Sequence, residues 1–285
     1  MSLEPYTNPV ARLLTFGSTG SYKPKEWPNY IEEAGLTATD VPELIRMATD
    51  PRFDEVASDE DEDEDEEVEK DAVWAPVHAM RALGQLRAEA AIAPLLTLFP
   101  LDDDFFRENL PGVFGLIGPA AIAPLANFLD DSTQDRWARV LANDCLEQVA
   151  LHFPETRPDC VTILTDQLVK YREREDEILD SSLIDTLVHL QAKEAAPLIG
   201  EVFAAKDVDE FLTGSWPMVQ VQLGLKQESD FTPEELEPEP PESVIRLRRF
   251  LQAQVVQERH KNKPSGFAPA PSAKSSKKSS KKKKK

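Results

Sequence analysis

Three consecutive aspartates, Asp102, Asp103 and Asp104, form a group of side chains with the chemistry to bind a divalent cation. Calcium-binding loops, however, usually alternate ligand residues with spacers and include a glycine, and this stretch does neither. An aspartate at the start of a helix can instead accept hydrogen bonds from free backbone N–H groups, with Glu108 supporting the first turn. We therefore predict a helix cap here, and we keep the three aspartates as candidate protein-binding residues.

The chain has four histidines, His78, His152, His189 and His260. None belongs to an HExxH motif, to an adjacent His-Glu pair or to a paired-cysteine spacing, which are the patterns typical of metal sites. We expect His78 to be a packed helix residue and His260 to be exposed to solvent. The sequence predicts no metal site, no catalytic residue and no bound cofactor.

The only two cysteines are Cys145 and Cys160. Two cysteines do not make a disulfide framework, so a reduced, cytoplasmic setting is the default expectation. A reactive thiol needs a basic neighbour that stabilises the thiolate. Here Asp144 and Asp159 precede the two cysteines instead, and we predict that both thiols pack in the core.

A repeat in the sequence predicts the helices that position these residues. Residues 90–95 and 120–125 both read AAIAPL, and looser copies of the same pattern occur elsewhere. Apolar residues follow each proline at helical spacing, and proline is tolerated in the first turn of a helix. We therefore expect each proline to mark the start of the second helix of a pair. The marker prolines are Pro42, Pro94, Pro124, Pro158 and Pro197, spaced by 30, 34 and 39 residues from Pro94 onward.

Another helical pattern precedes several of the marked helices. It is clear at residues 73–86, 137–153 and 178–190, where Trp137 is placed with Cys145 on one apolar face. We expect Gly84 and Gly118 to form turns between paired helices. Strand signals are nearly absent. Because one helix pair cannot bury its apolar face alone, the sequence predicts an all-α solenoid of about five stacked pairs over residues 1–225.

Trp216 stands near the end of the predicted stack, after the sequence TGS. Tryptophan is favoured at binding hot spots, so this side chain is a candidate anchor for a protein partner. It could equally cover the apolar surface of the last repeat, which would otherwise be open to solvent. We favour the covering role and keep Trp216 as a candidate protein-binding residue.

The stretch RALGQLRAEAAIAPLL at residues 81–96 resembles the HEAT-like repeat of the phycobilin-lyase type. The shared pattern is an Ala-Leu-Gly turn followed by Ala, Ile, Pro and Leu. Together with VPELIRMATD and LPGVFGLIGPAAIAPLANFL, it makes the chain similar to a group of bacterial HEAT-like proteins from about residue 8 to about residue 225. The resemblance implies an α-solenoid. It implies no particular activity, because such solenoids serve as adaptors, chaperones and enzyme subunits.

Charged residues are distributed unevenly along the chain. The formal net charge is −20 and the isoelectric point is about 4.6, which disfavours nucleic acid as a partner of the main body. Residues 59–67 are nine acids in a row, and residues 261–285 carry ten lysines. No apolar run approaches the roughly 20 residues of a membrane helix, so no membrane span is expected.

The composition also predicts the organisation outside the repeats. Residues 56–70 are expected to be a disordered acidic insertion, and residues 226–242 a linker rich in proline and glutamate. Residues 243–260 have the pattern of an amphipathic helix, and residues 261–285 that of a disordered, lysine-rich tail.

Two functions of different classes fit these features. The first is a non-catalytic scaffold or assembly adaptor that presents an acidic solenoid surface to a basic or amphipathic protein partner. The alternative, which follows from the resemblance, is a bilin-lyase-like enzyme subunit that holds a tetrapyrrole in its groove. Nucleic acid is expected as a partner only through the lysine-rich tail.

The nine-residue acidic run and the lysine-rich tail should attract each other within one chain, so that the tail covers part of the acidic surface and competes with basic ligands. The effective concentration of a tethered tail reaches the millimolar range, and salt limits the attraction to about 8 Å at physiological ionic strength. Deleting residues 261–285 should therefore strengthen the binding of a basic test peptide at low salt, with a difference that fades as salt is raised. Fluorescence anisotropy measures both affinities. Equal affinities at low salt would rule out the hypothesis that the tail covers part of the acidic surface.

Overall fold

The computed structural model describes residues 6–53, 71–101, 103–174, 176–205, 208–238 and Arg246. These residues form α-helices and 3₁₀ helices joined by turns, and this part of the chain contains no β-strand. The predicted all-α fold class is therefore confirmed. The contacts divide the chain into two units, Met1–Glu239 and Pro240–Lys285, and every helix discussed below belongs to the first unit.

Each of the marker prolines is the second or third residue of a helix, as predicted from the repeat. A 3₁₀ turn comes directly before each of these helices, so the repeated unit is longer than the proline pattern alone indicates. The units are η3 (Ala38–Asp40) with α2 (Val41–Ala48), η4 (Glu89–Ala91) with α6 (Ile92–Leu96), η5 (Pro119–Ala121) with α8 (Ile122–Asp130), η6 (Pro154–Thr156) with α10 (Arg157–Leu168), and η7 (Lys193–Ala195) with α13 (Ala196–Ala205).

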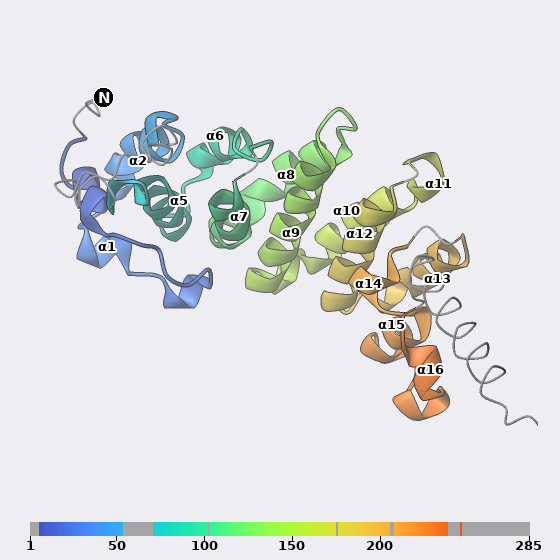
Figure 1. Ribbon diagram of the computed structural model, residues 1–285. Coiled ribbons are helices and arrows are strands. Elements are labelled where there is room, and N and C mark those ends of the chain that lie inside the picture. Colours follow the sequence, from blue (N-terminus) through green and yellow to red (C-terminus); the bar gives the residue numbers. More distant parts are fainter. Residues whose placement is uncertain are drawn as a thin grey trace, which may run out of the picture. The chain divides into compact units, whose positions relative to one another are not determined.

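Longer helices alternate with these units and contact one another in chain order (Figure 1). They are α5 (Ala75–Gln85), α7 (Asp104–Ile117), α9 (Arg136–His152) and α12 (Glu177–His189). Helix α7 packs between α5 and α9, and α9 packs between α7 and α12. This order is the one expected for stacked helix pairs, and the solenoid itself stays a prediction. The other described elements are η1 (Val10–Thr15), η2 (Pro24–Glu26), α1 (Tyr30–Glu33), α11 (Tyr171–Arg174), α14 (Glu210–Thr213), α15 (Trp216–Gln222), η8 (Glu228–Asp230) and α16 (Pro233–Leu236).

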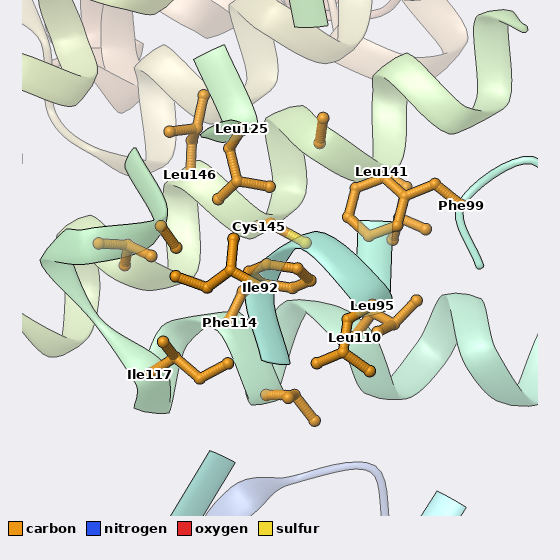
Figure 2. Close-up of a cluster of buried hydrophobic side chains, with 14 of the residues drawn as sticks. Ile92, Leu95, Phe99, Leu110, Phe114, Ile117, Leu125, Leu141, Cys145 and Leu146 are labelled. Atoms are coloured by element: carbon orange, nitrogen blue, oxygen red, sulfur yellow. The ribbon is translucent and has the colours of Figure 1, made fainter. Parts of the chain in front are cut away.

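One apolar cluster joins two successive repeats. Figure 2 shows side chains from α6, α7, α8 and α9 pointing into a common core. The ring of Phe99 lies 5.5 Å from that of Phe114 and 5.1 Å from that of Phe128, and the cluster continues into the rest of the core. Burying one such large side chain stabilises the fold by about 1.5–3 kcal/mol. The labelled members are Ile92, Leu95, Phe99, Leu110, Phe114, Ile117, Leu125, Leu141, Cys145 and Leu146.

The two glycines that we expected in turns have different roles. Gly118 ends α7 with φ of 93°, a left-handed conformation that favours glycine, so this expectation is confirmed. Gly84 instead lies inside α5, and a Cβ atom there would come within 3.2 Å of the Val113 Cα atom. The expected turn at Gly84 is therefore wrong, because this glycine allows α5 and α7 to approach closely.

Trp137 does not face the core, so its predicted place on the apolar face of α9 is wrong. Its side chain is 49% exposed, whereas Cys145 of the same helix is fully buried. Trp137 precedes Asp144 by seven residues and Leu151 by fourteen, and this spacing puts all three on the outer side of α9.

Arg81 of α5 anchors the N-terminal segment to the repeats. Its guanidinium is fully buried and donates hydrogen bonds to the Thr19 carbonyl at 2.7 Å and the Ser21 carbonyl at 2.8 Å. The Nε–H group donates to the side-chain oxygen of Asn109 on α7 at 2.8 Å. One cation of α5 thus satisfies polar groups of both the N-terminal segment and α7.

Several predicted segments fall outside the described residues. The acidic insertion at 56–70 and the lysine-rich tail at 261–285 lie outside them entirely, and so does the helix expected at 243–260 except for Arg246.

The proposed linker at 226–242 is described as far as residue 238 and contains η8 and α16. Helix α16 packs against α15, and the Ser215 hydroxyl donates to the Glu235 carbonyl at 2.8 Å. This part of the segment is therefore attached to the last repeat.

Within the described ranges, no single helix is both long and apolar enough to cross a membrane. The consecutive segments Asp104–Ile117 and Pro119–Asp130 would suffice together by length and composition, but they meet at a bend of 116°.

Leu95 and Leu125 occupy equivalent positions in two copies of the repeat, and both are fully buried. Replacing either by alanine should lower the free energy of unfolding by about 2–5 kcal/mol, because each change leaves a cavity. Leu225→Ala is the control, since this side chain is 42% exposed. Denaturant melts measure the three values, and a silent change at both buried positions would contradict their equivalence.

Candidate functional site

The aspartates before α7 act as a helix cap. The Asp103 carboxylate accepts hydrogen bonds from the backbone N–H groups of Phe105 at 2.7 Å and Phe106 at 3.1 Å, so the predicted cap is confirmed. The acid in the first turn is Asp104, whose side chain is 91% exposed, and Glu108 lies further along the helix. Asp102 lies outside the described residues.

Trp216 is the first residue of α15 and packs back against α13. Its ring centroid lies 5.5 Å from that of Phe203, and a Cβ atom on Gly200 would come within 3.1 Å of the Trp216 ring. The side chain is half-buried by this contact. Trp216 lies on α15, whereas Asp103 and Asp104 lie at the start of α7. These two helices do not pack together as a pair, so Trp216 and the two aspartates do not form one site.

His78 is a core residue, as predicted. It is 1% exposed, and its Nδ1 and Nε2 atoms lie 2.7 Å from the Tyr30 hydroxyl and 2.8 Å from the Gly17 carbonyl oxygen. The carbonyl can only accept, so Nε2 carries the proton and Nδ1 accepts from Tyr30. Burial lowers the pKa of His78 to about 4, which keeps the ring neutral.

Both cysteine thiols are buried, and burial raises their pKa. The preceding acids, Asp144 and Asp159, raise it further. The prediction of core packing for Cys145 and Cys160 is confirmed.

The structure brings together a group of acids that the sequence analysis did not single out. Glu108 of α7, Asp144 and Glu147 of α9, and Asp185 of α12 interact electrostatically across three neighbouring helices. We call these four residues the acidic face. They come from the three helices that pack in chain order, so the stacking of the repeats creates the cluster.

Asn143 fixes the register of α9 against α12 next to the acidic face. Its fully buried amide donates to the Thr186 hydroxyl at 2.8 Å and the Ser182 hydroxyl at 2.9 Å. The same amide lies 3.2 Å from the Asp144 carboxylate. This amide therefore links α9 to α12 and contacts one carboxylate of the acidic face, that of Asp144.

The environment of the acidic face favours protonated carboxyl groups. Burial raises the pKa of Asp144 to about 7, and the charges of Glu147, Asp185 and Glu108 add to the shift. Burial and the charge of Asp185 also raise the pKa of Glu147, against the effect of His189. Burial raises the pKa of Asp185 in the same way. These acids therefore repel one another when all are ionised.

His189 of α12 is the basic side chain that contacts this group. Its Nδ1 atom lies 3.0 Å from a Glu147 oxygen and 3.7 Å from an Asp185 oxygen. The chain has no adjacent His-Glu pair, yet folding forms one between two helices. Across the described part of the chain, no three His, Cys, Asp or Glu side chains are arranged to hold a metal ion.

Exposed apolar side chains accompany the acidic face. Trp137 and Leu151 of α9 are 49% and 51% exposed, and they stand seven residues before and after Asp144. Phe105, three residues before Glu108 on α7, is 43% exposed. Carboxylates between apolar groups form a surface that can bind a segment carrying both basic and apolar side chains.

The signal for this surface was present in the sequence. Asp144 and Glu147 are three apart, Asp185 and His189 are four apart, and Trp137, Asp144 and Leu151 recur every seven residues. The spacing alone does not show that the two helices are neighbours with these sides aligned. That information depends on the packing of α9 against α12.

An all-α chain of repeated helical units is the class that the fold defines. The family model described as "Protein of unknown function (DUF1186)" matches residues 41–245. This match covers more than half of the chain, so the chain belongs to that family. It includes α2 and the whole acidic face. No curated protein matches the chain, and no solved structure matches it.

The raised pKa of Asp144 predicts how stability depends on pH. The unfolded carboxyl has an ordinary pKa of about 4, so the folded state binds this proton more tightly. The resulting destabilisation is absent below about pH 4, grows as pH rises, and is complete above about pH 7. Asp144→Asn should therefore raise the melting temperature at pH 8 and leave it nearly unchanged at pH 4.

Asp166→Asn is the matched control, because Asp166 is exposed on α10 and the substitution makes the same change in charge. Thermal melts followed by circular dichroism at several pH values measure the difference. An Asp144→Asn variant that is no more stable than wild type at pH 8 would contradict the assigned environment.

Proposed function

We propose that this protein is a HEAT-like α-solenoid that works as a non-catalytic, cytoplasmic adaptor. Its acidic face binds a basic, amphipathic segment of a protein partner. The observation that carries the proposal is the group of carboxylates that three helices bring together, with the exposed apolar side chains Trp137 and Leu151 before and after Asp144 on α9.

The acidic face lacks its counter-charges. Within the described residues, none of its four carboxylates forms an ion pair with lysine or arginine, and His189 is the only basic group in contact. A bound cationic segment would favour the ionised forms and so lower the raised pKa values. The relief of repulsion then contributes to binding, and complementary charge speeds the encounter.

The apolar side chains favour an amphipathic partner over a purely basic one. Trp137 is a large exposed ring, and tryptophan is among the residues that contribute most to binding energy at interfaces. Its separation from Leu151 spans four turns of α9, a length that a short partner helix can match.

The repeated units support the solenoid part of the proposal. Five copies of a 3₁₀ turn followed by a proline-marked helix, with longer helices that contact in chain order, are consistent with HEAT-like stacking. Such repeats serve in many proteins as extended binding surfaces. The formal charge of −20 gives this surface a long-range preference for cations.

The test is binding of a synthetic amphipathic helix patterned with lysine and leucine, measured by fluorescence anisotropy. Glu147→Gln/Asp185→Asn should weaken binding roughly three- to tenfold by removing two charges from the acidic face. Trp137→Ala should weaken it by about tenfold through loss of apolar contact. Wild-type affinity should rise from about pH 6 to about pH 8, because Asp144 must release its proton to bind a cation.

Glu155→Gln/Asp166→Asn is the control variant, since it removes two charges from exposed positions outside the acidic face. The same peptide with glutamate in place of lysine is the control ligand. Equal weakening by both double variants would show that only net charge matters and would refute the assigned site. If no basic peptide binds, and a bilin mixed with the protein gains visible absorption, the enzyme-subunit alternative replaces the adaptor.

A further inference from the structure

A cleft of about 450 Å³ lies where α9 and α12 begin and where α10 ends. Four cationic side chains line it, namely Arg136, Arg139, Lys170 and Arg174. A chain with a formal charge of −20 thus gathers basic groups in one place. The volume falls within the range of small-molecule sites, which is roughly 300–1,000 Å³.

Arg139 is a buried cation without a paired carboxylate. The residue is 7% exposed, and its Nε–H group donates to the Leu129 carbonyl at 2.8 Å. No carboxylate among the described residues lies within ion-pair distance of its guanidinium. Burial lowers the pKa of Arg139 and the charge of Arg174 lowers it further, against the opposite effect of the charges of Asp176, Asp130 and Asp131. The two guanidinium groups therefore lie close enough to repel each other.

Arg174 is incompletely paired as well. Its side chain is 10% exposed, and one terminal nitrogen forms an ion pair with the fully buried Asp180. The Nε and Nη1 atoms are buried and have no hydrogen-bond partner in the part of the chain that the structure describes. Unsatisfied buried donors are rare in folded proteins, and each lowers stability when no acceptor compensates it.

At the rim of the cleft, the other two cations form ion pairs with acidic side chains. Arg136 contacts Asp176 at 2.9 Å, and Lys170 forms an ion pair with Asp130. With Glu173, the lining has four cations and three carboxylates, and the buried Asp180 behind Arg174 balances the fourth charge. The cations at the rim are 46% and 44% exposed, which leaves them accessible to a ligand from solvent.

We infer that this cleft binds a phosphate group, either as inorganic phosphate or as the monoester of a small molecule. Two neighbouring guanidinium groups offer planar donors that match phosphate oxygens, and a dianion would offset the repulsion between them. Lys170 and Arg136 would add contacts from the rim. The space beyond one phosphate group accommodates a small organic substituent.

The experiment titrates the full-length protein with inorganic phosphate, glycerol phosphate and a sugar phosphate by isothermal titration calorimetry at constant ionic strength. At least one of the three should bind saturably at one site, and comparison among them identifies free phosphate or an ester as the better ligand. Arg139→Gln should weaken that binding by roughly tenfold, because a charge-assisted hydrogen bond is lost. Acetate tests a simple carboxylate in place of phosphate.

Arg172→Gln is the matched control. Arg172 is 70% exposed and pairs with Glu201 outside the cleft. Its replacement by glutamine changes the charge by the same amount, so the phosphate affinity of this variant should stay within about twofold of wild type. If circular dichroism shows that Arg139→Gln does not fold, Lys170→Gln and Arg136→Gln at the exposed rim decide instead, each with several-fold weaker binding expected. No saturable phosphate binding, equal effects of Arg172→Gln and the cleft variants, or acetate binding as tight as phosphate would each overturn the inference.

Discussion

The close approach of α7 to α9 is the constraint on which the rest of this structure depends. Gly115 makes it possible, because a Cβ atom there would come within 3.0 Å of both the Gln148 Cβ and the His152 Nδ1 atoms. Gly84 has the same role between α5 and α7. Close packing of these helices encloses the apolar cluster of Figure 2, and it also brings Glu108 within electrostatic reach of Asp144.

The acidic face is therefore a product of the packing that stabilises the fold. Its carboxylates repel one another, and the raised pKa values of Asp144, Glu147 and Asp185 mean that ionisation of these three acids opposes folding at neutral pH. The fully buried residues Cys145, Leu146 and Leu187 of α9 and α12 offset that destabilisation through apolar contact. Residues that reduce stability are typical of functional sites, where a partner can supply the missing interactions.

Local features of the fold could be predicted from the sequence, and features that depend on helix register could not. The marker prolines, the Asp103 cap and the packed His78 follow from short-range rules on helix ends and burial. The place of Trp137 was predicted wrongly, because an apolar residue in an amphipathic pattern is normally assigned to the core. Glu108 and Asp185 of the acidic face are 77 positions apart, and Asp130 and Asp176 of the cationic cleft are 46 apart. Only the observed packing of α7, α9 and α12 brings such residues together.

Helices α9 and α12 support both surfaces, and the polar contacts between them explain how. Arg136 pairs with Asp176 where the two helices begin, Asn143 binds Thr186 in the middle, and Glu147 contacts His189 near the end. Apolar contacts alone allow neighbouring helices to slide, whereas directional hydrogen bonds and ion pairs fix one register. A shift by one residue would move the carboxylates of the acidic face off their common side. The polar contacts of this helix pair therefore specify the register on which both surfaces depend, while the apolar core supplies the stability.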